Sequence, residues 1–313
     1  TRDPYRIWVS EIMLQQTRAV AVIPYYQRFL ERFPTVEALA GSQEPELLEC
    51  WSGLGYYTRA RNLRRAAQQI VAERAGRLPR TSREWAELAG VGPYTAAAVA
   101  SIAFDEPVAV LDGNVARVMA RLAGHRGDIR SPRVREELRE RAQKLLDRRH
   151  PGQFNQAVME LGATLCSPRN PQCLLCPVAA WCEARRLGVQ NELPVRLGRR
   201  EPERIEMAVA VVRRDGKLLL RRRPEEASVM PGFWELPAPD GLAVGEPLGR
   251  FRHAITHHRY TVTAYPARPP RRLPPGCRWI ALADLPGLPL TTISRKALRL
   301  TPPEGPSSRN PRR

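Results

Sequence analysis

Four cysteines crowd into one short stretch of this sequence and constrain its fold more than any other feature. With the spacing C-x6-C-x2-C-x5-C, they are Cys166, Cys173, Cys176 and Cys182. Four thiolates this close together are typical of a metal centre, and they suit either zinc or an iron–sulfur cluster. Either group would rigidify the loop 166–182 and bring basic neighbours such as Arg169 to a phosphate backbone.

The chain is strongly basic, which limits the partners that its surface binds. Its 50 Lys and Arg residues outnumber its 32 Asp and Glu residues and give a formal net charge of +18. Such a surface attracts polyanions, of which phosphate is the commonest. Apart from Lys144, Lys217 and Lys296, these cations are arginines, which bind phosphate in a bidentate manner. A coding bias toward arginine would give the same composition, so the charge only favours nucleic acid.

No membrane segment is expected, because no apolar run approaches the roughly 20 residues that span a bilayer. No charged-then-apolar leader opens the chain either. We therefore expect a soluble, cytoplasmic protein. Its 313 residues suit two domains better than one.

Residues 1–184 are expected to form an all-α domain. From Pro4 to about residue 165, apolar residues recur at helical spacing, and Gly, Pro and capping residues separate the segments. No segment there has a convincing strand pattern. The clearest helical patterns lie around residues 60–71, 82–88, 93–104, 114–123, 132–149 and 152–165.

A second, small α+β domain is expected over residues 205–300. The polar stretch 185–204 is typical of a linker, and Asp215-Gly216 between two apolar runs is a hairpin signal. The Pro-, Ser- and Arg-rich tail 301–313 is expected to be disordered. The expected strands are residues 207–212, 218–220, 249–255, 259–265 and 277–281.

Glycines between two expected helices form a candidate phosphate-binding turn. The segment Leu88-Ala-Gly-Val-Gly-Pro-Tyr94 follows one helix and opens another, which is the layout of a helix-hairpin-helix. Gly90 and Gly92 permit a tight turn that brings backbone N–H groups to a phosphate at a helix N-terminus. Glycine turns between helices are common, but the Thr- and Ala-rich helix that follows allows close packing.

Two carboxylates stand out by their surroundings. Glu11 interrupts an otherwise uncharged helix, and Asp112 precedes a helix in Leu111-Asp-Gly-Asn-Val. A solvated charge at Glu11 and a helix cap at Asp112 would also explain the local sequence. Together, the two groups suit cleavage of an N-glycosidic bond. One carboxylic acid protonates the leaving base, and an ionised carboxylate stabilises the oxocarbenium-like sugar.

An enzyme that cleaves this bond in a duplex must extract the nucleotide from the stack, and wedge residues fill the gap. Gln16 lies one turn beyond Glu11, and Tyr56 follows the glycines of Gly53-Leu-Gly-Tyr-Tyr. Both are candidates for this role. A tyrosine in such a turn also serves to close a hydrophobic core, and the sequence leaves this alternative open.

Five segments, in order along residues 3–183, resemble the helix-hairpin-helix DNA glycosylases with an iron–sulfur cluster, and specifically the MutY-type adenine DNA glycosylases. They are Ser10-Glu-Ile-Met-Leu-Gln-Gln-Thr, Trp51-Ser-Gly-Leu-Gly-Tyr-Tyr, the glycine hairpin, Leu111-Asp-Gly-Asn-Val and the four-cysteine loop. The resemblance implies a [4Fe–4S] cluster rather than zinc. It also implies that the substrate is double-stranded DNA with adenine opposite 8-oxoguanine, and we expect a monomer associated with the bacterial nucleoid.

The resemblance assigns roles within the helical domain. It implies that Glu11 is the acid at adenine N7 and that Asp112 is the stabilising carboxylate. Tyr94, Asn114 and Gln156 are implied to support the adenine pocket, the first two at the catalytic centre.

Other residues are implied to contact the duplex. Gln16 and Tyr56 enter it beside 8-oxoguanine, Leu14 lies next to them, and Gly90 and Gly92 hold the backbone. Relatives also carry a Pro-Trp-Arg-type segment just before the position of Thr1, so we expect preceding residues to form one wall of the pocket.

Lysine usage separates two classes of related enzymes. Relatives of the endonuclease III type, which also cleave the DNA backbone, place a lysine where Tyr94 stands, because Schiff-base chemistry needs an amine. This chain has no lysine before Lys144, which predicts a glycosylase without lyase activity. The enzymatic alternative is a glycosylase/lyase or a thymine-mismatch glycosylase on the same fold. The alternative outside enzymes is a metal-stapled DNA-binding protein.

Residues 205 to about 300 more weakly resemble the Nudix-like domain with which MutY-type proteins inspect the base opposite adenine. Nudix hydrolysis requires an acidic helix that holds Mg²⁺. The stretch between Trp234-Glu235 and Phe251 is rich in Pro and Gly and leaves no room for it. We therefore expect no nucleotide hydrolysis by this domain.

The 8-oxoguanine reader of the family is a Phe-Ser-His triplet, and the matching residues here are Ile255, Thr256 and His257. Thr256 keeps a hydroxyl that donates and accepts hydrogen bonds. Ile255 lacks an aromatic ring, which weakens the expected preference for 8-oxoguanine. The alternative interpretation of His257-His258 is an ordinary histidine at a strand end.

Overall fold

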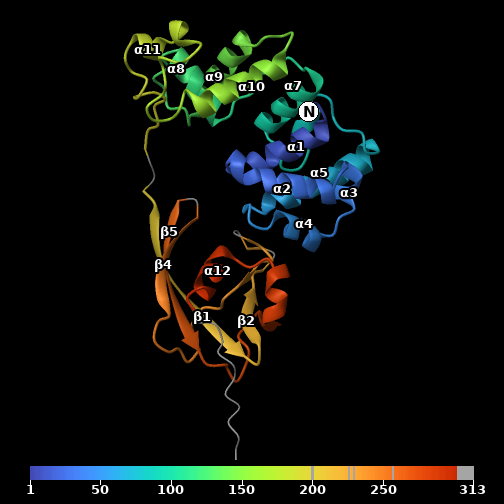
Figure 1. Cartoon of the computed structure of the whole chain (residues 1–313), viewed down its shortest axis with the longest axis vertical. Helices are drawn as coiled ribbons and strands as arrows, with labels where there is room; N and C mark the ends of the chain where they lie inside the picture. Colours follow the sequence, from blue (N-terminus) through green and yellow to red (C-terminus); the bar gives the residue numbers. More distant parts are fainter. Residues whose placement is uncertain (199–200, 225, 228–229, 256, 302–313) are drawn as a thin grey trace, which may run out of the picture. The chain divides into compact units, whose positions relative to one another are not determined.

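The chain folds into two compact units, Thr1–Arg199 and Arg200–Arg313 (Figure 1). The computed structural model describes residues 1–198, 201–224, 226–227, 230–255 and 257–301. The first unit is helical, and the second combines a six-stranded sheet with short helices, which confirms the expected fold class. No helix in the described ranges is long and apolar enough to cross a membrane. Residues 302–313, where disorder is predicted, lie outside the described residues.

The helices of the first unit begin and end close to the Gly, Pro and capping residues that the sequence predicts as boundaries. No strand occurs among its described residues, as the sequence predicts. The helices are α1 (Pro4–Leu14), α2 (Ala19–Arg32), α3 (Val36–Ala40), α4 (Glu44–Trp51), α5 (Thr58–Arg74), α6 (Ser82–Ala86), α7 (Pro93–Phe104), α8 (Gly113–Leu122), α9 (Pro132–Leu145), α10 (Pro151–Thr164), the 3₁₀ helix η1 (Ala179–Trp181) and α11 (Glu183–Arg186).

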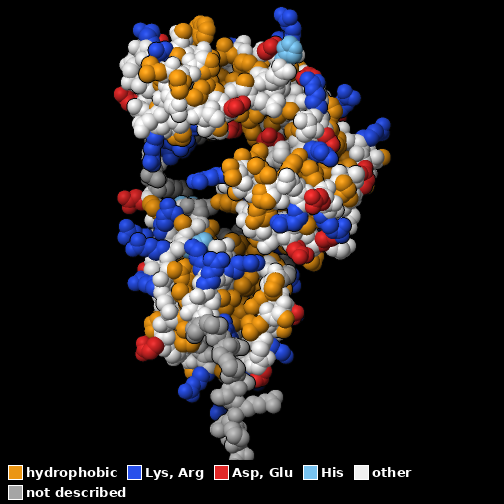
Figure 2. All heavy atoms as spheres, in the orientation of Figure 1, with side chains coloured by type: hydrophobic (Ala, Val, Ile, Leu, Met, Phe, Trp, Pro, Cys, Tyr) orange, Lys and Arg blue, Asp and Glu red, His pale blue; other side chains and the backbone are white. Residues whose placement is uncertain are grey.

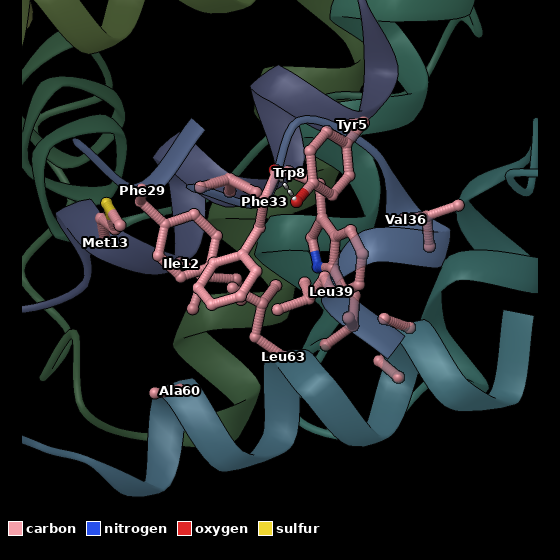
Figure 3. Close-up of a cluster of buried hydrophobic side chains, with 14 of the residues drawn as sticks. Tyr5, Trp8, Ile12, Met13, Phe29, Phe33, Val36, Leu39, Ala60 and Leu63 are labelled. Atoms are coloured by element: carbon pink, nitrogen blue, oxygen red, sulfur yellow. Dashed lines mark hydrogen bonds between the residues drawn. The ribbon is translucent and has the colours of Figure 1, made fainter. Parts of the chain in front are cut away.

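A large hydrophobic core fixes α1 along its length. Trp8 of α1 is fully buried, and its ring lies 5.4 Å from that of Trp85. The Tyr5 hydroxyl donates to the Phe33 carbonyl oxygen at 2.7 Å (Figure 3). Because each fully buried side chain of this size contributes about 2 to 3 kcal/mol, the core holds α1, and with it Glu11, in one position.

Helix α7 is shared by two cores. Its residues Val99 and Ala100 belong to the core around α1, and Ala97 and Ala98 belong to a second core formed with α8 and α9. A helix that is apolar all round must be buried on every side, and small side chains allow its neighbours to approach closely. The N-terminus of α7 therefore lies where the two cores meet.

Two glycines let α10 approach α7 and α8. A Cβ atom at Gly152 would lie 2.7 Å from the Ser101 carbonyl oxygen, and one at Gly162 would lie 2.7 Å from the Asn114 Cβ. Real Cβ atoms do not tolerate such contacts, so any larger residue would push α10 away. The close packing places α10 beside the segment that follows Leu111.

Residues 185–195 pack against α8 and do not form the linker that the sequence predicts over 185–204. Val189 and Leu193 are buried together with Ala184, and Arg121 donates from Nε to the Leu193 carbonyl oxygen at 2.9 Å. The prediction is wrong for this stretch because a few apolar side chains in a polar segment suffice to bury it. The first unit therefore extends past residue 184, and the next strand begins at Glu203.

The second unit is a mixed sheet with strand order β3-β2-β1-β5-β4, in which β6 also pairs with β2. All five predicted strands are present, while the two-residue β3 was not predicted. Asp215 and Gly216, both with positive φ, form the predicted turn between β1 and β2. The strands are β1 (Glu203–Arg214), β2 (Lys217–Arg222), β3 (Trp234–Glu235), β4 (Gly249–Ile255), β5 (His258–Ala267) and β6 (Cys277–Ala281).

Helix α12 (Thr292–Leu298) covers one face of this sheet, and the acidic Nudix helix that the sequence excludes does not form in the described residues. Helix α12 packs on β1 and β5, after the 3₁₀ helix η2 (Leu282–Gly287). Residues 236–248, between β3 and β4, are all described and contain no helix, as the sequence predicts. The Glu235 carboxylate instead accepts hydrogen bonds from Arg221 at 2.9 Å and Arg223 at 2.6 Å.

Candidate active site

Glu11 lies at the junction of the two cores of the first unit. It is 8% exposed, so the alternative of a solvated charge is wrong. The Tyr94 hydroxyl, from the first turn of α7, donates to Glu11 Oε2 at 2.7 Å and lies 3.2 Å from the Met159 sulfur. The two side chains are 83 residues apart in the sequence. The packing of α1 against α7 brings them together.

The surroundings of Glu11 favour its protonated form. Burial raises the pKa of this carboxyl, the Tyr94 hydrogen bond lowers it, and the charge of Asp112 raises it further. Desolvation is the largest of these effects because water no longer stabilises the charged form. Burial also raises the pKa of Tyr94, so its hydroxyl keeps its proton and serves as a hydrogen-bond donor. Glu11 therefore has the properties of a general acid.

Asp112 is both a helix cap and a neighbour of Glu11. Its Oδ1 accepts from the Val115 N–H at 2.7 Å at the N-terminus of α8. The capping alternative is therefore correct, and it does not exclude catalysis. A carboxylate at a helix N-terminus is stabilised in its charged form by the helix dipole and by the N–H groups. The cap also fixes where this negative charge lies relative to Glu11.

Asn114 lies in the first turn of α8, two residues after this cap, and is held by a buried arginine. Arg117 Nη2 donates to Asn114 Oδ1 at 2.9 Å and to the Gly162 carbonyl oxygen at 2.6 Å. Its Nε donates to the Cys166 carbonyl oxygen at 2.8 Å. One guanidinium thus joins the start of α8 to the cysteine loop.

A second buried arginine of α8 contacts the cysteine loop. Arg121, 1% exposed, donates from Nη1 to the Cys166 sulfur at 3.2 Å and to the Ser167 carbonyl oxygen at 2.7 Å. Burial raises the pKa of Cys173, and the charges of Cys182, Cys166 and Cys176 raise it further, so all four thiols lie within electrostatic reach. In the described part of the chain, no three His, Cys, Asp or Glu side chains are grouped to hold a single metal ion.

Gln16 and Tyr56 are exposed at the tips of two loops. Gln16, just after α1, has φ +58°, and Tyr56, just before α5, has φ +49°. Tyr56 is 47% exposed, so the alternative of a core lid is wrong. Leu14, 36% exposed, lies at the end of α1. Positive φ is unfavourable for residues other than glycine, which suggests that these conformations have a function.

The glycine turn forms as predicted before α7. Gly90 has φ +73°, and a Cβ there would lie 2.6 Å from the Asn62 Cβ. Gly92 is the N-cap of α7, and no side chain caps this helix. The N-terminus of α7, where helix N–H groups are unsatisfied, is therefore available to an external acceptor.

Gln156 is less clearly part of the site. It is exposed on α10, and its amide donates to the Gly152 carbonyl oxygen of its own helix at 3.0 Å. It borders a cavity of about 300 Å³, which does not include Glu11, Tyr94 or Asp112. The other lining residues are Thr1, Arg2, Ile102, Asp105, Gly152 and Gln153.

The predicted reader residues that the structure describes lie where β4 ends and β5 begins. Ile255 ends β4, Thr256 lies outside the described residues, and His257 is exposed, with its ring 4.4 Å from that of His258. His258 also approaches Glu203 at 3.2 Å. The structure therefore presents His257 at the tip of a hairpin.

Sequence reasoning missed three arginines. Arg117 and Arg121 lie four residues apart on α8 among buried apolar residues, and Arg59 binds the carbonyl oxygens of the residues directly before both loop tips. The only signal for the first two is a cation repeated at helical spacing on a face that is otherwise apolar. Arg59 gives no such signal, because its partners are backbone carbonyls of other segments.

Known protein families match both units of the chain. The family model for the HhH-GPD superfamily of base excision DNA repair proteins matches residues 9–144, and a NUDIX domain model matches residues 207–300. The adenine DNA glycosylase of Mus musculus is 33% identical over 371 residues, which cover 96% of this chain and 72% of that protein.

Two solved structures resemble the helical unit. A thermostable thymine-DNA glycosylase is 30% identical with a TM-score of 0.55, covering 60% of this chain and 86% of that chain. Endonuclease III in a non-covalent complex with DNA is 25% identical with a TM-score of 0.53, covering 61% of this chain and 87% of that chain. Together with the buried acid at the meeting point of α1, α7 and α8, these similarities show that the chain belongs to the MutY-type adenine DNA glycosylases, base-excision repair enzymes that hydrolyse N-glycosyl bonds.

Proposed function

We propose that this protein removes adenine paired with 8-oxoguanine, or with guanine, from duplex DNA, without cleaving the backbone. The observation that carries the proposal is the buried Glu11 carboxyl, hydrogen-bonded by Tyr94 at 2.7 Å and influenced by the charge of Asp112. An acid that stays protonated beside a fixed carboxylate is what depurination requires.

The chemistry assigns a separate step to each carboxyl group. Glu11 transfers its proton to N7 of the extruded adenine, and the electrons of the N-glycosidic bond leave with the base. The sugar becomes oxocarbenium-like, and the Asp112 carboxylate stabilises its positive charge. Water then adds to C1′, and its released proton restores Glu11. Tyr94 and Asn114 hold the two carboxyl groups and the base in position.

The sequence has no lysine before Lys144, which supports hydrolysis without lyase activity. Tyr94 occupies the position at which endonuclease III-type relatives carry their lysine, and its phenol cannot form a Schiff base. We expect borohydride to trap no covalent adduct with DNA that contains an abasic site. A robust trapped adduct would favour the glycosylase/lyase alternative.

We also propose that Cys166, Cys173, Cys176 and Cys182 hold a [4Fe–4S] cluster. The fit is supported by the buried Arg121, which donates to the Cys166 sulfur and would offset the negative charge of a thiolate-ligated centre. The bound cluster would brace the loop that Arg117 joins to Asn114. Brown protein that contains iron and sulfide is expected, and stoichiometric zinc in colourless, anaerobically purified protein would contradict the proposal.

The first unit offers separate contacts for duplex DNA. The uncapped N-terminus of α7 suits a phosphate, and the exposed Gln16 and Tyr56 suit entry into the base stack. Lys and Arg side chains are spread over the surface of both units (Figure 2). These features support binding of a duplex with one extruded nucleotide.

The second unit offers a cationic sheet face beside His257. Arg204 pairs opposite Arg259, and Arg252 lies two residues from the partner of Arg259 on β4. All three side chains are exposed, on the face that α12 does not cover. We call these residues the arginine face.

The arginine face lacks internal compensation. Like charges directly opposite each other destabilise a sheet, and none of the three arginines has an acidic partner among the described residues. Phosphates would neutralise these charges. We infer that this face holds the backbone of the strand whose base His257 and Thr256 inspect.

Replacing Glu11 tests the function directly. Glu11→Gln keeps a partner for Tyr94 but removes the acidic proton, so adenine excision is expected to fall about 10²- to 10⁴-fold while duplex binding is retained. The matched control is Glu49→Gln, an exposed carboxylate on α4. Single-turnover assays compare adenine opposite 8-oxoguanine, guanine and cytosine, with thymine opposite guanine as a fourth substrate. Equal activity of Glu11→Gln and the control would refute the assignment, and preferential release of thymine would favour the thymine-mismatch alternative.

A further inference from the structure

Arg59, near the start of α5, ties together two loops that are far apart in the sequence. Its Nη1 donates to the carbonyl oxygens of Ile12 at 3.0 Å and Met13 at 2.9 Å, and also to that of Gln15. These acceptors belong to the end of α1 and the loop that leads to Gln16. One nitrogen therefore satisfies carbonyls that a helix C-terminus leaves without partners.

The other nitrogen of the same guanidinium holds the second loop. Arg59 Nη2 donates to the carbonyl oxygens of Leu54 at 3.3 Å and Gly55 at 3.2 Å, and to the Thr17 hydroxyl at 3.3 Å. These bonds fix the turn that ends in Tyr56. The guanidinium also lies 5.5 Å from the Trp51 ring centre and 5.6 Å from that of Tyr56.

The two loops end in residues with unusual backbone conformations. Gln16 and Tyr56 are two of seven non-glycine residues with positive φ in the described part of the chain. Such conformations persist only where the surrounding structure holds them. Arg59 supplies hydrogen bonds directly before both residues. Burial lowers the pKa of Arg59, yet a guanidinium stays protonated in proteins, so all its N–H groups remain donors.

We propose that Arg59 is a positioning residue that sets the spacing of Gln16 and Tyr56, so that both enter the duplex together when adenine is extruded. The inference rests on the proposed function, in which these two tips enter the base stack. Arg59 makes no contact with Glu11, Tyr94 or Asp112 among the described residues. It therefore acts on extrusion of the base and leaves the acid chemistry unchanged.

A lysine cannot replace this arginine. The planar guanidinium carries donors in a fixed fork that reaches both loops, whereas an ammonium is a single point with three donors. Arg59→Lys is therefore expected to lower the single-turnover rate of adenine excision about tenfold to a hundredfold, as for a misplaced substrate-positioning group. The pH dependence of the rate should stay as in the parent protein. Arg65→Lys, an exposed position on the same helix, is the control and should be neutral.

A thermodynamic cycle distinguishes positioning from simple stability. The rate is measured for Arg59→Lys, for Gln16→Ala/Tyr56→Ala and for the triple variant, with 2-aminopurine beside the target adenine to report unstacking. If Arg59 acts through the tips, Arg59→Lys lowers the excision rate and the unstacking signal when Gln16 and Tyr56 are present. In the Gln16→Ala/Tyr56→Ala background, the same substitution should lower the rate by less than about twofold. Equal losses in both backgrounds, or a shifted pH profile, would overturn the proposal.

A milder variant covers the case in which Arg59→Lys does not fold. Thr17→Val removes one acceptor of Arg59 and keeps the guanidinium in place, so a smaller loss is expected, again only when the tips are present. An unchanged rate for Thr17→Val in folded protein would count against the proposal. Full activity of Gln16→Ala/Tyr56→Ala would refute entry of the tips into the duplex and the role of Arg59 together. A loss in that variant with additive effects of Arg59→Lys would refute the role of Arg59 alone.

Discussion

The site around Glu11 and the hairpin around His257 are built on opposite principles. Glu11 is buried between helices, and Tyr94 holds it at 2.7 Å. His257 is exposed at a strand end, and the nearest ring is that of its neighbour His258. Proton transfer needs a fixed geometry and a desolvated acid. Inspection of a base needs an exposed side chain that can contact the edge of that base. In the proposed function, the chemistry therefore belongs to the core of one unit, and the base opposite adenine is read by a surface of the other.

Among the tests of this comparison, replacing Asp112 should change the rate of adenine excision most. Asn caps a helix as well as Asp does, so Asp112→Asn keeps the start of α8 and removes only the charge. The rate of adenine excision is expected to fall about 10²- to 10³-fold, as for loss of a preorganised electrostatic contact. Asp3→Asn is a matched control, because Asp3 caps α1 in the same way. Unchanged kinetics of Asp112→Asn would show that this residue serves only as a helix cap.

Neutralising the arginine face should weaken binding but not chemistry. Arg204→Gln/Arg252→Gln/Arg259→Gln is expected to lower the slope of log affinity against log salt by about 2 to 3, as for the loss of that many phosphate contacts. The rate of the bound complex should stay the same. The charge-matched control replaces Arg268, Arg271 and Arg272, which are exposed in the loop after β5. Equal changes in both triple variants would mean that only net charge matters.

Removing the Tyr94 hydroxyl should shift the pH profile of excision. This hydrogen bond lowers the pKa of Glu11, so Tyr94→Phe raises that pKa, and the acid stays protonated to a higher pH. The fall of the rate on the alkaline side is therefore expected at higher pH than in the parent protein. Lost positioning should also lower the plateau rate roughly tenfold, as for the loss of one hydrogen bond between neutral groups. If the alkaline fall of the rate moves to lower pH or stays at the same pH, Glu11 is not the acid.

Introducing an aromatic ring at Ile255 should give the smallest change, a moderate increase in the preference for 8-oxoguanine as the opposite base. Ile255→Phe is expected to raise the preference for adenine opposite 8-oxoguanine over adenine opposite guanine about twofold to fivefold, because bases stack on aromatic rings. The ratio of the two single-turnover efficiencies measures it. The isosteric control is Ile255→Leu. Equal gains for Phe and Leu would show that side-chain shape, not stacking, decides the preference.

Local sequence predicted most of the fold. Helix boundaries followed Gly, Pro and capping residues, and the Asp215-Gly216 turn placed β1 and β2 correctly. The absence of room for an acidic helix before β4 was also visible in the sequence. The linker prediction failed over residues 185–195, because burial of Val189 and Leu193 depends on a surface of α8 that no local pattern reveals.

The sequence by itself determined which carboxylates, cysteines and loop residues are candidates, because those motifs are short and contiguous. Only the tertiary structure decided how they act together. Tyr94 reaches Glu11 across 83 residues, and Arg59 reaches the Ile12 carbonyl oxygen across 47 residues, through a backbone group that carries no sequence signature. Burial and hydrogen bonding across such separations depend on how α1, α5, α7 and α8 pack, and the burial that results raises the pKa of Glu11.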